Sequence, residues 1–178
     1  VVIVGAGPIG LAAVMTASFY APGAIIMIDH DDYRLSFAKT LGATTVINSG
    51  RTNAAEEIMV LTGGRGADVA IEAVGIPATF ELCQSIIGAG GHIANVGVHA
   101  QSVPLHLERL WSQNITITTR LVDAVTTPML MKSVTSGRLQ PAQLITHRFP
   151  LTEVMQAYEV FGHAASEHAL KVILTNIG

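Results

Sequence analysis

Apolar and polar positions follow two alternating spacings along this chain, and together they predict strands and helices in regular succession. Short runs rich in Val and Ile are typical of strands buried on both faces, whereas apolar residues three to four positions apart indicate helices. The runs predict strands at residues 1–4, 25–28, 44–47, 69–74, 92–98 and 115–119. The helical spacing predicts helices at residues 11–19, 35–41, 54–62, 77–87 and 105–111, and a glycine run at residues 88–91 is expected to end the fourth. Six strands joined by helical crossovers indicate an α/β fold with a doubly wound parallel sheet.

Beyond residue 121 the pattern changes, and a carboxy-terminal extension of the αβαβ type is expected. Residues 128–136 and 152–161 have helical spacing, whereas residues 143–149 and 169–174 are expected to be extended. We therefore divide the chain into a sheet core at residues 1–121 and an extension at residues 122–178. The sequence leaves two possibilities open: the extension continues the sheet, or it returns to a second lobe that lies outside the chain.

Composition narrows the classes of protein that fit. Of 178 residues, 49% are hydrophobic and only 13% are charged, which favours a sheet buried on both faces and apolar surface that meets another domain or subunit. The formal net charge is −3 without a basic run, so nucleic acid and anionic membranes are poor partners. No apolar stretch is long enough for a transmembrane helix. The single cysteine excludes an internal disulfide, and we expect a reducing, cytoplasmic compartment.

The first predicted strand runs directly into Gly5-Ala6-Gly7-Pro8-Ile9-Gly10, a Gly-x-Gly-x-x-Gly sequence, and the second ends at Asp29. In this arrangement Gly5 makes the turn, Gly7 leaves room for a pyrophosphate, and Gly10 lets the following helix pack closely. The helix directs its free N–H groups and the positive end of its dipole at the phosphates. Asp29 can accept hydrogen bonds from both hydroxyls of the adenosine ribose, and it would repel a 2′-phosphate. The sequence therefore predicts a Rossmann-type dinucleotide site that prefers NAD to NADP.

Motifs spread over the whole chain resemble those of the medium-chain, zinc-dependent alcohol dehydrogenases. Besides the glycine fingerprint, the matching segments are Ile28-Asp29 with Arg34, Leu41-Gly42-Ala43, Glu72-Ala73-Val74-Gly75, Gly90-Gly91, Asn95-Val96-Gly97-Val98, Leu144-Ile145-Thr146-His147 and Leu170-Lys171-Val172-Ile173-Leu174. The resemblance implies that the chain is the coenzyme-binding half of such an enzyme. In that family a preceding lobe supplies the Cys, His and Glu ligands of the active-site zinc. We expect that lobe to lie outside this chain, which starts inside a strand without an initiator Met.

The resemblance also implies coenzyme contacts for individual residues. Gly5, Gly7 and Gly10 match the fingerprint, the N–H of Ile9 is expected to face the pyrophosphate, and Pro8 has no N–H to donate. The remaining contacts implied are Asp29 and Arg34 at the adenosine ribose, Ala73 and Val74 beside the adenosine, Val96, Val98 and Thr119 at the nicotinamide carboxamide, and Lys171 at the pyrophosphate. Independently of any family, Val96 and Val98 are expected to be buried strand residues.

The sequence contains no legible catalytic or metal-binding pattern. Its histidines are His30, His92, His99, His106, His147, His163 and His168, and none has a metal-ligand spacing. Cys83 lies among apolar residues of a predicted helix and is expected to be a buried packing thiol. His99 follows the fifth predicted strand, which places it among the candidate neighbours of the nicotinamide. We expect the chain alone to be inactive, and the whole protein to transfer hydride between NAD and a small alcohol, aldehyde or ketone with the help of zinc.

Three other functions fit parts of the pattern. A zinc-free quinone or enoyl reductase of the same superfamily would usually prefer NADPH, which Asp29 disfavours. A methyltransferase also has an acid after its second strand, but its glycine loop usually lacks the third glycine. A nucleotide-sensing module without catalysis is the alternative outside the enzymes.

The sixth predicted strand, residues 115–119, is expected to lie at an edge of the sheet. Its sequence, Ile115-Thr116-Ile117-Thr118-Thr119, has no charge and no proline, although natural edges are usually protected by one or the other. We therefore expect a homodimer or tetramer in which this strand pairs with its copy about a two-fold axis. Related alcohol dehydrogenases dimerise through this element. The alternative is that residues 121–135 cover the edge.

Overall fold

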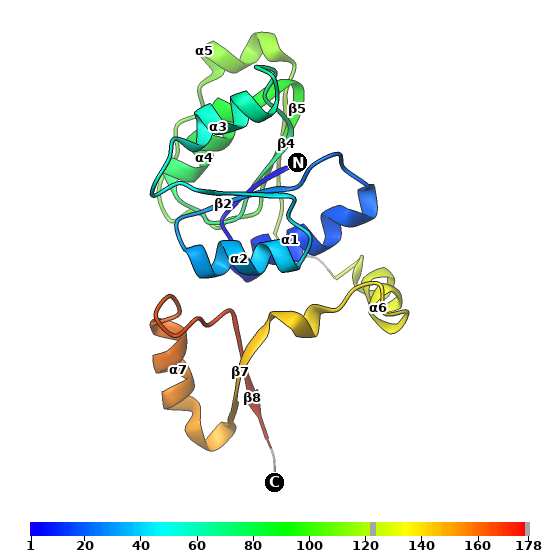
Figure 1. Ribbon diagram of the computed structural model, residues 1–178, viewed down its shortest axis with the longest axis vertical. Coiled ribbons are helices and arrows are strands. Elements are labelled where there is room, and N and C mark those ends of the chain that lie inside the picture. The colour runs from blue at the N-terminus through cyan, green and yellow to red at the C-terminus, as the bar shows by residue number, and fades with distance from the viewer. Residues whose placement is uncertain (122–123, 177–178) are drawn as a thin grey trace. The chain divides into compact units, whose positions relative to one another are not determined.

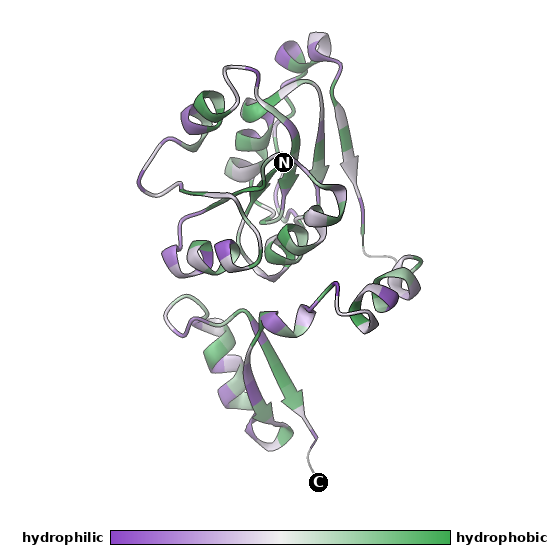
Figure 2. Ribbon diagram, turned by 45° about the vertical axis from the view of Figure 1, so that its right-hand side comes forward, coloured by the Kyte–Doolittle hydropathy of each residue, from purple (hydrophilic) through white to green (hydrophobic). Residues whose placement is uncertain are grey.

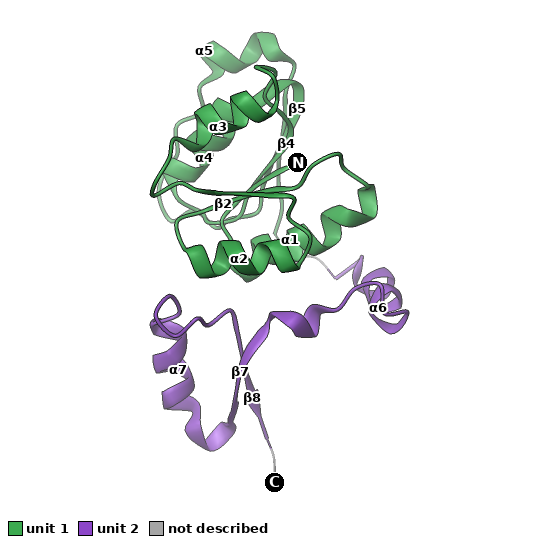
Figure 3. Ribbon diagram, in the orientation of Figure 1, with its two compact units in different colours: residues 1–122 green, residues 123–178 purple. Residues whose placement is uncertain are grey.

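The computed structural model describes residues 1–121 and 124–176, which belong to two compact units, Val1–Val122 and Asp123–Gly178 (Figures 1 and 3). The first unit contains a six-stranded parallel sheet in the order β3-β2-β1-β4-β5-β6. Its strands are β1 (Val2–Val4), β2 (Ile26–Asp29), β3 (Thr45–Asn48), β4 (Ala67–Glu72), β5 (Ile87–Asn95) and β6 (Thr116–Thr119). The strand order reverses between β1 and β4, which confirms the doubly wound sheet predicted from the sequence.

Helices connect the successive strands of this sheet. They are α1 (Pro8–Ala17), α2 (Asp32–Thr40), α3 (Ala54–Leu61), α4 (Pro77–Ile86) and α5 (Leu107–Leu110), with short 3₁₀ turns η1 (Ser18–Tyr20) and η2 (Trp111–Gln113). Side-chain caps fix where two of them begin: the Asp31 side chain accepts from Arg34 N at 3.1 Å, and the Asn53 side chain accepts from Ala55 N at 3.1 Å. In contrast, α1 follows Gly7 and has no side-chain cap.

The core lies around the central strands, along which Figure 2 shows mainly hydrophobic residues. Every residue of β1 is buried, and Val2 pairs in register with Ile26 on one side and with Ala70 on the other. A strand covered on both faces needs a continuous apolar run, and this is the pattern that the sequence showed at residues 1–4.

β5 begins at Ile87, earlier in the sequence than the predicted residue 92, and therefore includes the glycine run at residues 88–91. We expected residues 88–91 to end the preceding helix, but α4 ends at Ile86 and β5 begins at Ile87 without a turn. The ladder between β4 and β5 is irregular here, because its register shifts between Ala67 and Val69. A side chain at Gly88 would collide with the carbonyl oxygen of Arg65. The glycine therefore allows β5 to lie close to the turn that precedes β4.

The other end of β5 also differs from the prediction. The strand ends at Asn95 rather than at residue 98, and the expectation that Val96 and Val98 are buried strand residues is wrong, since they are 45% and 82% exposed. The physical reason lies in Glu72, whose carbonyl oxygen accepts from Val96 N at 2.9 Å and from Gly97 N at 3.1 Å. Two successive N–H groups on one carbonyl turn the chain away from the ladder with β4.

The second unit has its own small sheet. Its elements are α6 (Thr127–Thr135), η3 (Pro141–Leu144), β7 (Ile145–Pro150), η4 (Leu151–Glu153), α7 (Val154–Gly162) and β8 (Lys171–Thr175). β7 and β8 pair with each other in parallel, and α7 contacts both of them. In the described part of the chain the extension therefore does not continue the six-stranded sheet. No helix among the described residues has the length and apolar content needed to cross a membrane.

Candidate functional site

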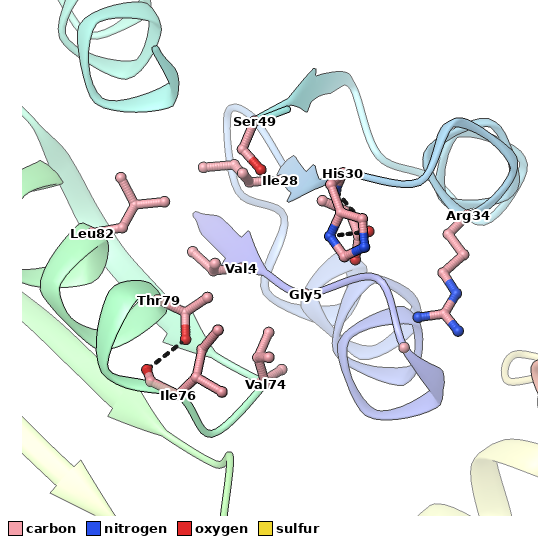
Figure 4. Close-up of a pocket in the computed structure, with 13 residues that line it drawn as sticks. Val4, Gly5, Ile28, His30, Arg34, Ser49, Val74, Ile76, Thr79 and Leu82 are labelled. Atoms are coloured by element: carbon pink, nitrogen blue, oxygen red, sulfur yellow. Dashed lines mark hydrogen bonds and ion pairs between the residues drawn. The ribbon is translucent and has the colours of Figure 1, made fainter. Parts of the chain in front are cut away.

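A pocket of about 300 Å³ opens at the carboxyl ends of β1, β2 and β4, where the strand order reverses (Figure 4). In open α/β sheets this is the position at which ligands bind. The pocket is lined by Val4, Gly5, Gly7, Ile28, Asp29, His30, Arg34, Ser49, Ala73, Val74, Ile76, Thr79 and Leu82.

The turn between β1 and α1 forms one wall and depends on two glycines. Gly5 has a φ of +101°, which is strained for any residue with a side chain, and its N–H donates to the Ile28 carbonyl at 2.8 Å. A Cβ at Gly5 would collide with the side chain of Val74, and a Cβ at Gly10 would collide with the carbonyl oxygen of Gly5. The first turn of α1 can therefore lie directly against the glycine loop.

Gly7 differs from these two glycines, because a Cβ on it would meet no atom within 4 Å. It lines the pocket and precedes α1, whose first residue, Pro8, has no N–H and whose amino end has no side-chain cap. Ile9, in this first turn, is 53% exposed. An open space beside an uncapped helix amino terminus suits a phosphate group, since free N–H groups and the helix dipole both favour an anion there.

Asp29 ends β2 and lines the pocket, although the residue is only 8% exposed. Its Oδ2 atom accepts from Ala6 N at 2.6 Å, while Oδ1 accepts from His30 N at 2.8 Å and from Asp31 N at 2.9 Å. Three backbone donors thus hold the carboxylate in place from two different loops. The carboxylate at the pocket wall has a position set by the fold before any ligand binds.

Two basic side chains flank this carboxylate. The Nδ1 atom of His30 lies 3.6 Å from Asp29 Oδ1, and its side chain is 82% exposed. The Arg34 side chain is 23% exposed, lines the pocket, and has its Nε atom 3.9 Å from Asp31 Oδ2 (Figure 4). The pocket therefore combines one fixed negative charge with one permanent positive charge.

The structure brings together six of the residues proposed from the sequence and leaves the others outside this pocket. Those at the pocket are Gly5, Gly7, Asp29, Arg34, Ala73 and Val74. Val96 and Val98 follow β5 and are exposed, and Thr119 is the exposed last residue of β6. Lys171 is the exposed first residue of β8 in the second unit.

Comparison with known proteins decides the family. The family model described as zinc-binding dehydrogenase matches residues 8–134. The chain belongs to this family. An alcohol dehydrogenase of Cupriavidus necator is 35% identical to it over 167 residues, which cover 92% of this chain and 46% of the relative.

Solved structures agree with this dehydrogenase assignment. The zinc-dependent alcohol dehydrogenase 2 from Streptococcus pneumonia, in its apo form, is 52% identical with a TM-score of 0.95, over 99% of this chain and 52% of that one. An alcohol dehydrogenase from E. coli CFT073, solved with cofactor NADH, is 26% identical with a TM-score of 0.90, over 98% and 51%. The chain thus spans about half the length of these relatives, and its resemblance to the coenzyme half of zinc-dependent alcohol dehydrogenases is confirmed.

The dehydrogenase domain also contains a buried polar pair that the sequence did not single out. Glu72, the last residue of β4, is fully buried, and His99 lies beyond the end of β5 with its Nε2 atom 3.4 Å from Glu72 Oε2. In the sequence, Glu72 belongs to a segment that matches the family, whereas His99 follows the fifth predicted strand as a candidate neighbour of the nicotinamide. The signal that pairs them is their place at the carboxyl ends of neighbouring parallel strands, with Glu72 as the last residue of β4 and His99 in the loop after β5.

Cys83 is buried in the core, as expected from its apolar neighbours. Burial raises the pKa of its thiol to about 12, and the negative charge of Glu72 adds to this rise. The thiol is therefore protonated and unreactive near neutral pH. Among residues 1–121 and 124–176, no group of three or more His, Cys, Asp or Glu side chains is arranged to hold a metal ion.

Proposed function

We propose that this chain is the NAD(H)-binding half of a zinc-dependent alcohol dehydrogenase. The observation that carries the proposal is the pocket at the reversal of strand order, which combines the open Gly7 loop with the fixed carboxylate of Asp29. A dinucleotide needs both features, because one receives its pyrophosphate and the other its adenosine ribose.

Each wall of the pocket would contribute one part of coenzyme binding. The N–H groups at the start of α1, including that of Ile9, would donate to the pyrophosphate, and Asp29 would accept from the ribose hydroxyls. Arg34 would lie beside the same ribose, and the backbone at Ala73 and Val74 would border the adenosine. Val96, Val98 and Thr119 would bring their main chain to the nicotinamide carboxamide, and Lys171 would reach the pyrophosphate.

The whole protein would transfer hydride between the nicotinamide and a small alcohol, aldehyde or ketone. NAD supplies the hydride chemistry, and zinc, when bound, polarises the substrate oxygen as a Lewis acid. The chain spans about half the length of its zinc-dependent relatives, and the family resemblance assigns the zinc ligands to a preceding lobe, so we place them in sequence that accompanies this chain in the whole protein. The chain's own task would then be to bind and orient the coenzyme, and turnover would require the accompanying sequence.

We also propose that β6 joins two copies of the chain. Among the described residues it pairs with β5 alone, so no described strand pairs with the backbone groups on its other side. Pairing of two such edges about a two-fold axis would give a continuous sheet.

Substitution of Gly7 by Val tests the coenzyme site. A side chain there meets no protein atom within 4 Å, and the φ of Gly7 is −71°, so the variant should fold normally and yet block the approach of the pyrophosphate. We expect NADH binding, followed by fluorescence, to weaken at least about tenfold. Gly23→Val is the matched control, because it also has open space around its Cβ and lies outside the pocket. Binding that is unchanged in Gly7→Val, or a wild-type chain that binds no NADH, would overturn the proposal.

A further inference from the structure

Glu72 connects the two loops that follow β4 and β5. Its Oε1 atom accepts from Val74 N and Gly75 N, each at 2.9 Å, and from the Thr79 hydroxyl at 2.6 Å. Its carbonyl oxygen accepts from Val96 N and Gly97 N. A single, fully buried residue therefore fixes the loop after β4 through its side chain and the loop after β5 through its main chain.

The second carboxylate oxygen of Glu72 lies against the loop after β5 but accepts no hydrogen bond from the described residues. A Cβ at Gly97 would collide with this oxygen, so the glycine allows the loop to pack directly on the carboxylate. In the described part of the chain, the one basic side-chain atom within ion-pair distance of Glu72 Oε2 is Nε2 of His99, at 3.4 Å. The carboxylate oxygen of Glu72 that accepts no hydrogen bond from the described residues therefore faces His99.

His99 is held in place by Asn95 and Phe80. Its Nε2 atom lies 2.8 Å from Asn95 Oδ1, and Asn95 uses its Nδ2 to donate to the Gly97 carbonyl at 3.1 Å. Because Oδ1 of Asn95 is an acceptor, Nε2 must carry the proton, and that proton faces Asn95 Oδ1 and Glu72 Oε2. The Phe80 ring meets the imidazole edge-on with centroids 5.9 Å apart.

These loops follow strands on the opposite side of β1 from Asp29, and the loop after β4 borders the Asp29 pocket. β4 and β5 are on one side of β1, whereas β2, which ends at Asp29, is on the other. A dinucleotide that places its adenosine ribose at Asp29 and its pyrophosphate at α1 extends its second nucleoside over the ends of β4 and β5. The two loops also touch, since a Cβ at Gly75, where φ is +90°, would lie 2.9 Å from Val98 N.

We propose that Glu72 and His99 are positioning residues for the nicotinamide half of the coenzyme. Together they hold the loop at residues 96–99, against which the nicotinamide nucleoside binds, to the loop at residues 73–76, which borders the adenosine pocket. The proposal rests on the proposed coenzyme function and extends it, because it assigns a task to two residues that do not themselves line the adenosine pocket. Its consequence is selective: loss of the His99 proton donor should weaken ligands that contain nicotinamide and spare those that lack it.

The experiment compares NADH with ADP-ribose, which lacks the nicotinamide ring, on the 178-residue chain. NADH binding is measured by fluorescence and ADP-ribose binding by calorimetry. For His99→Leu, which keeps the bulk against Phe80 and removes the donor, we expect NADH affinity to fall about tenfold while ADP-ribose affinity changes less than about twofold. For His99→Gln, whose amide retains a donor at the ε position, we expect most of the NADH affinity to return. His92→Leu, an exposed position on β5, is the matched control.

The outcomes separate this inference from the proposed function. Equal losses for both ligands in His99→Leu, no loss for either, or no recovery in His99→Gln would each overturn the positioning role. A wild-type chain that binds ADP-ribose and NADH equally well would also overturn it, while the dinucleotide site itself would stand. A wild-type chain that binds neither ligand would refute the proposed function, and the positioning role with it.

Discussion

The Oδ2 atom of Asp29 accepts a hydrogen bond of 2.6 Å from the backbone N–H of Ala6, which joins the end of β2 to the glycine loop after β1. The residue proposed to recognise the adenosine ribose therefore also holds the loop proposed to receive the pyrophosphate. Two parts of one ligand site are coupled through this bond, so substitutions at Asp29 are expected to affect both the stability of the fold and coenzyme choice.

The first prediction concerns the choice between coenzymes. NADPH would place its 2′-phosphate next to the buried carboxylate of Asp29, and two anions in a partly desolvated pocket repel each other. We expect the chain to bind NADH more tightly than NADPH by at least about tenfold, despite the positive charge of Arg34 nearby. Parallel fluorescence titrations with the two coenzymes measure this directly. Equal or tighter binding of NADPH would contradict the prediction and would favour a zinc-free reductase of the same superfamily.

The second prediction concerns stability. Asp29→Ser removes the acceptor of three backbone N–H groups, and buried donors without partners are costly. We expect the free energy of unfolding in urea to fall by about 1–3 kcal/mol, in addition to weaker NADH binding. Asp68→Ser, at an exposed position of β4, is the control and should change stability by less than about 0.5 kcal/mol. An Asp29→Ser variant as stable as the control would show that these bonds do not support the loop.

The third prediction concerns Cys83. Since burial and Glu72 raise the pKa of its thiol from about 9 to about 12, native protein at pH 8 should react with a thiol reagent only as fast as it unfolds. The folded protein holds the Cys83 proton more tightly than the unfolded chain does. The stability that this difference supports is therefore complete below the unfolded pKa of about 9, and it is lost as the pH rises towards the folded pKa of about 12. Unfolding in urea at pH 8 and pH 10.5 should show a larger loss of stability for wild type than for Cys83→Ala. Rapid labelling of the native protein would contradict a buried thiol.

The strands and the glycine loop were predictable because local sequence determines them. Buried parallel strands need continuous apolar runs, and the turn at Gly5 needs a positive φ, so both leave a mark on a few consecutive residues. The ends of β5 were not predictable, because distant residues set them. Its start depends on how closely Gly88 approaches Arg65, and its end depends on the carbonyl of Glu72, which takes the N–H groups of the two residues after Asn95.

The candidate site shows the same division between local and distant causes. Asp29 and the glycines could be identified from sequence, since a fixed spacing relates them to the first two strands. The pairing of Glu72 with His99 could not, because residues 27 positions apart meet only after β4 and β5 have paired. The exposure of Val96 and Val98 has the same origin, since it follows from the turn that Glu72 imposes.

The last prediction concerns self-association through β6. The strand pairs with β5 through Ile117 opposite Ile93, and Thr116, Thr118 and Thr119 are exposed and uncharged. An edge of this kind lacks the Lys or Pro that usually protects natural edges from pairing with a second copy.

We expect wild type to sediment as a dimer or a larger assembly at micromolar concentration and Thr118→Lys to shift it towards monomer, because two copies would bring like charges together at the two-fold axis. Ile117→Pro should act more strongly, since it also removes a backbone donor, but Ile117 packs partly against the core and its loss will cost some stability. Thr40→Lys adds the same charge at an exposed position on α2 and should leave the assembly intact. A wild-type chain that remains monomeric at high micromolar concentration, or a Thr118→Lys variant that assembles as well as Thr40→Lys, would show that β6 is not the interface.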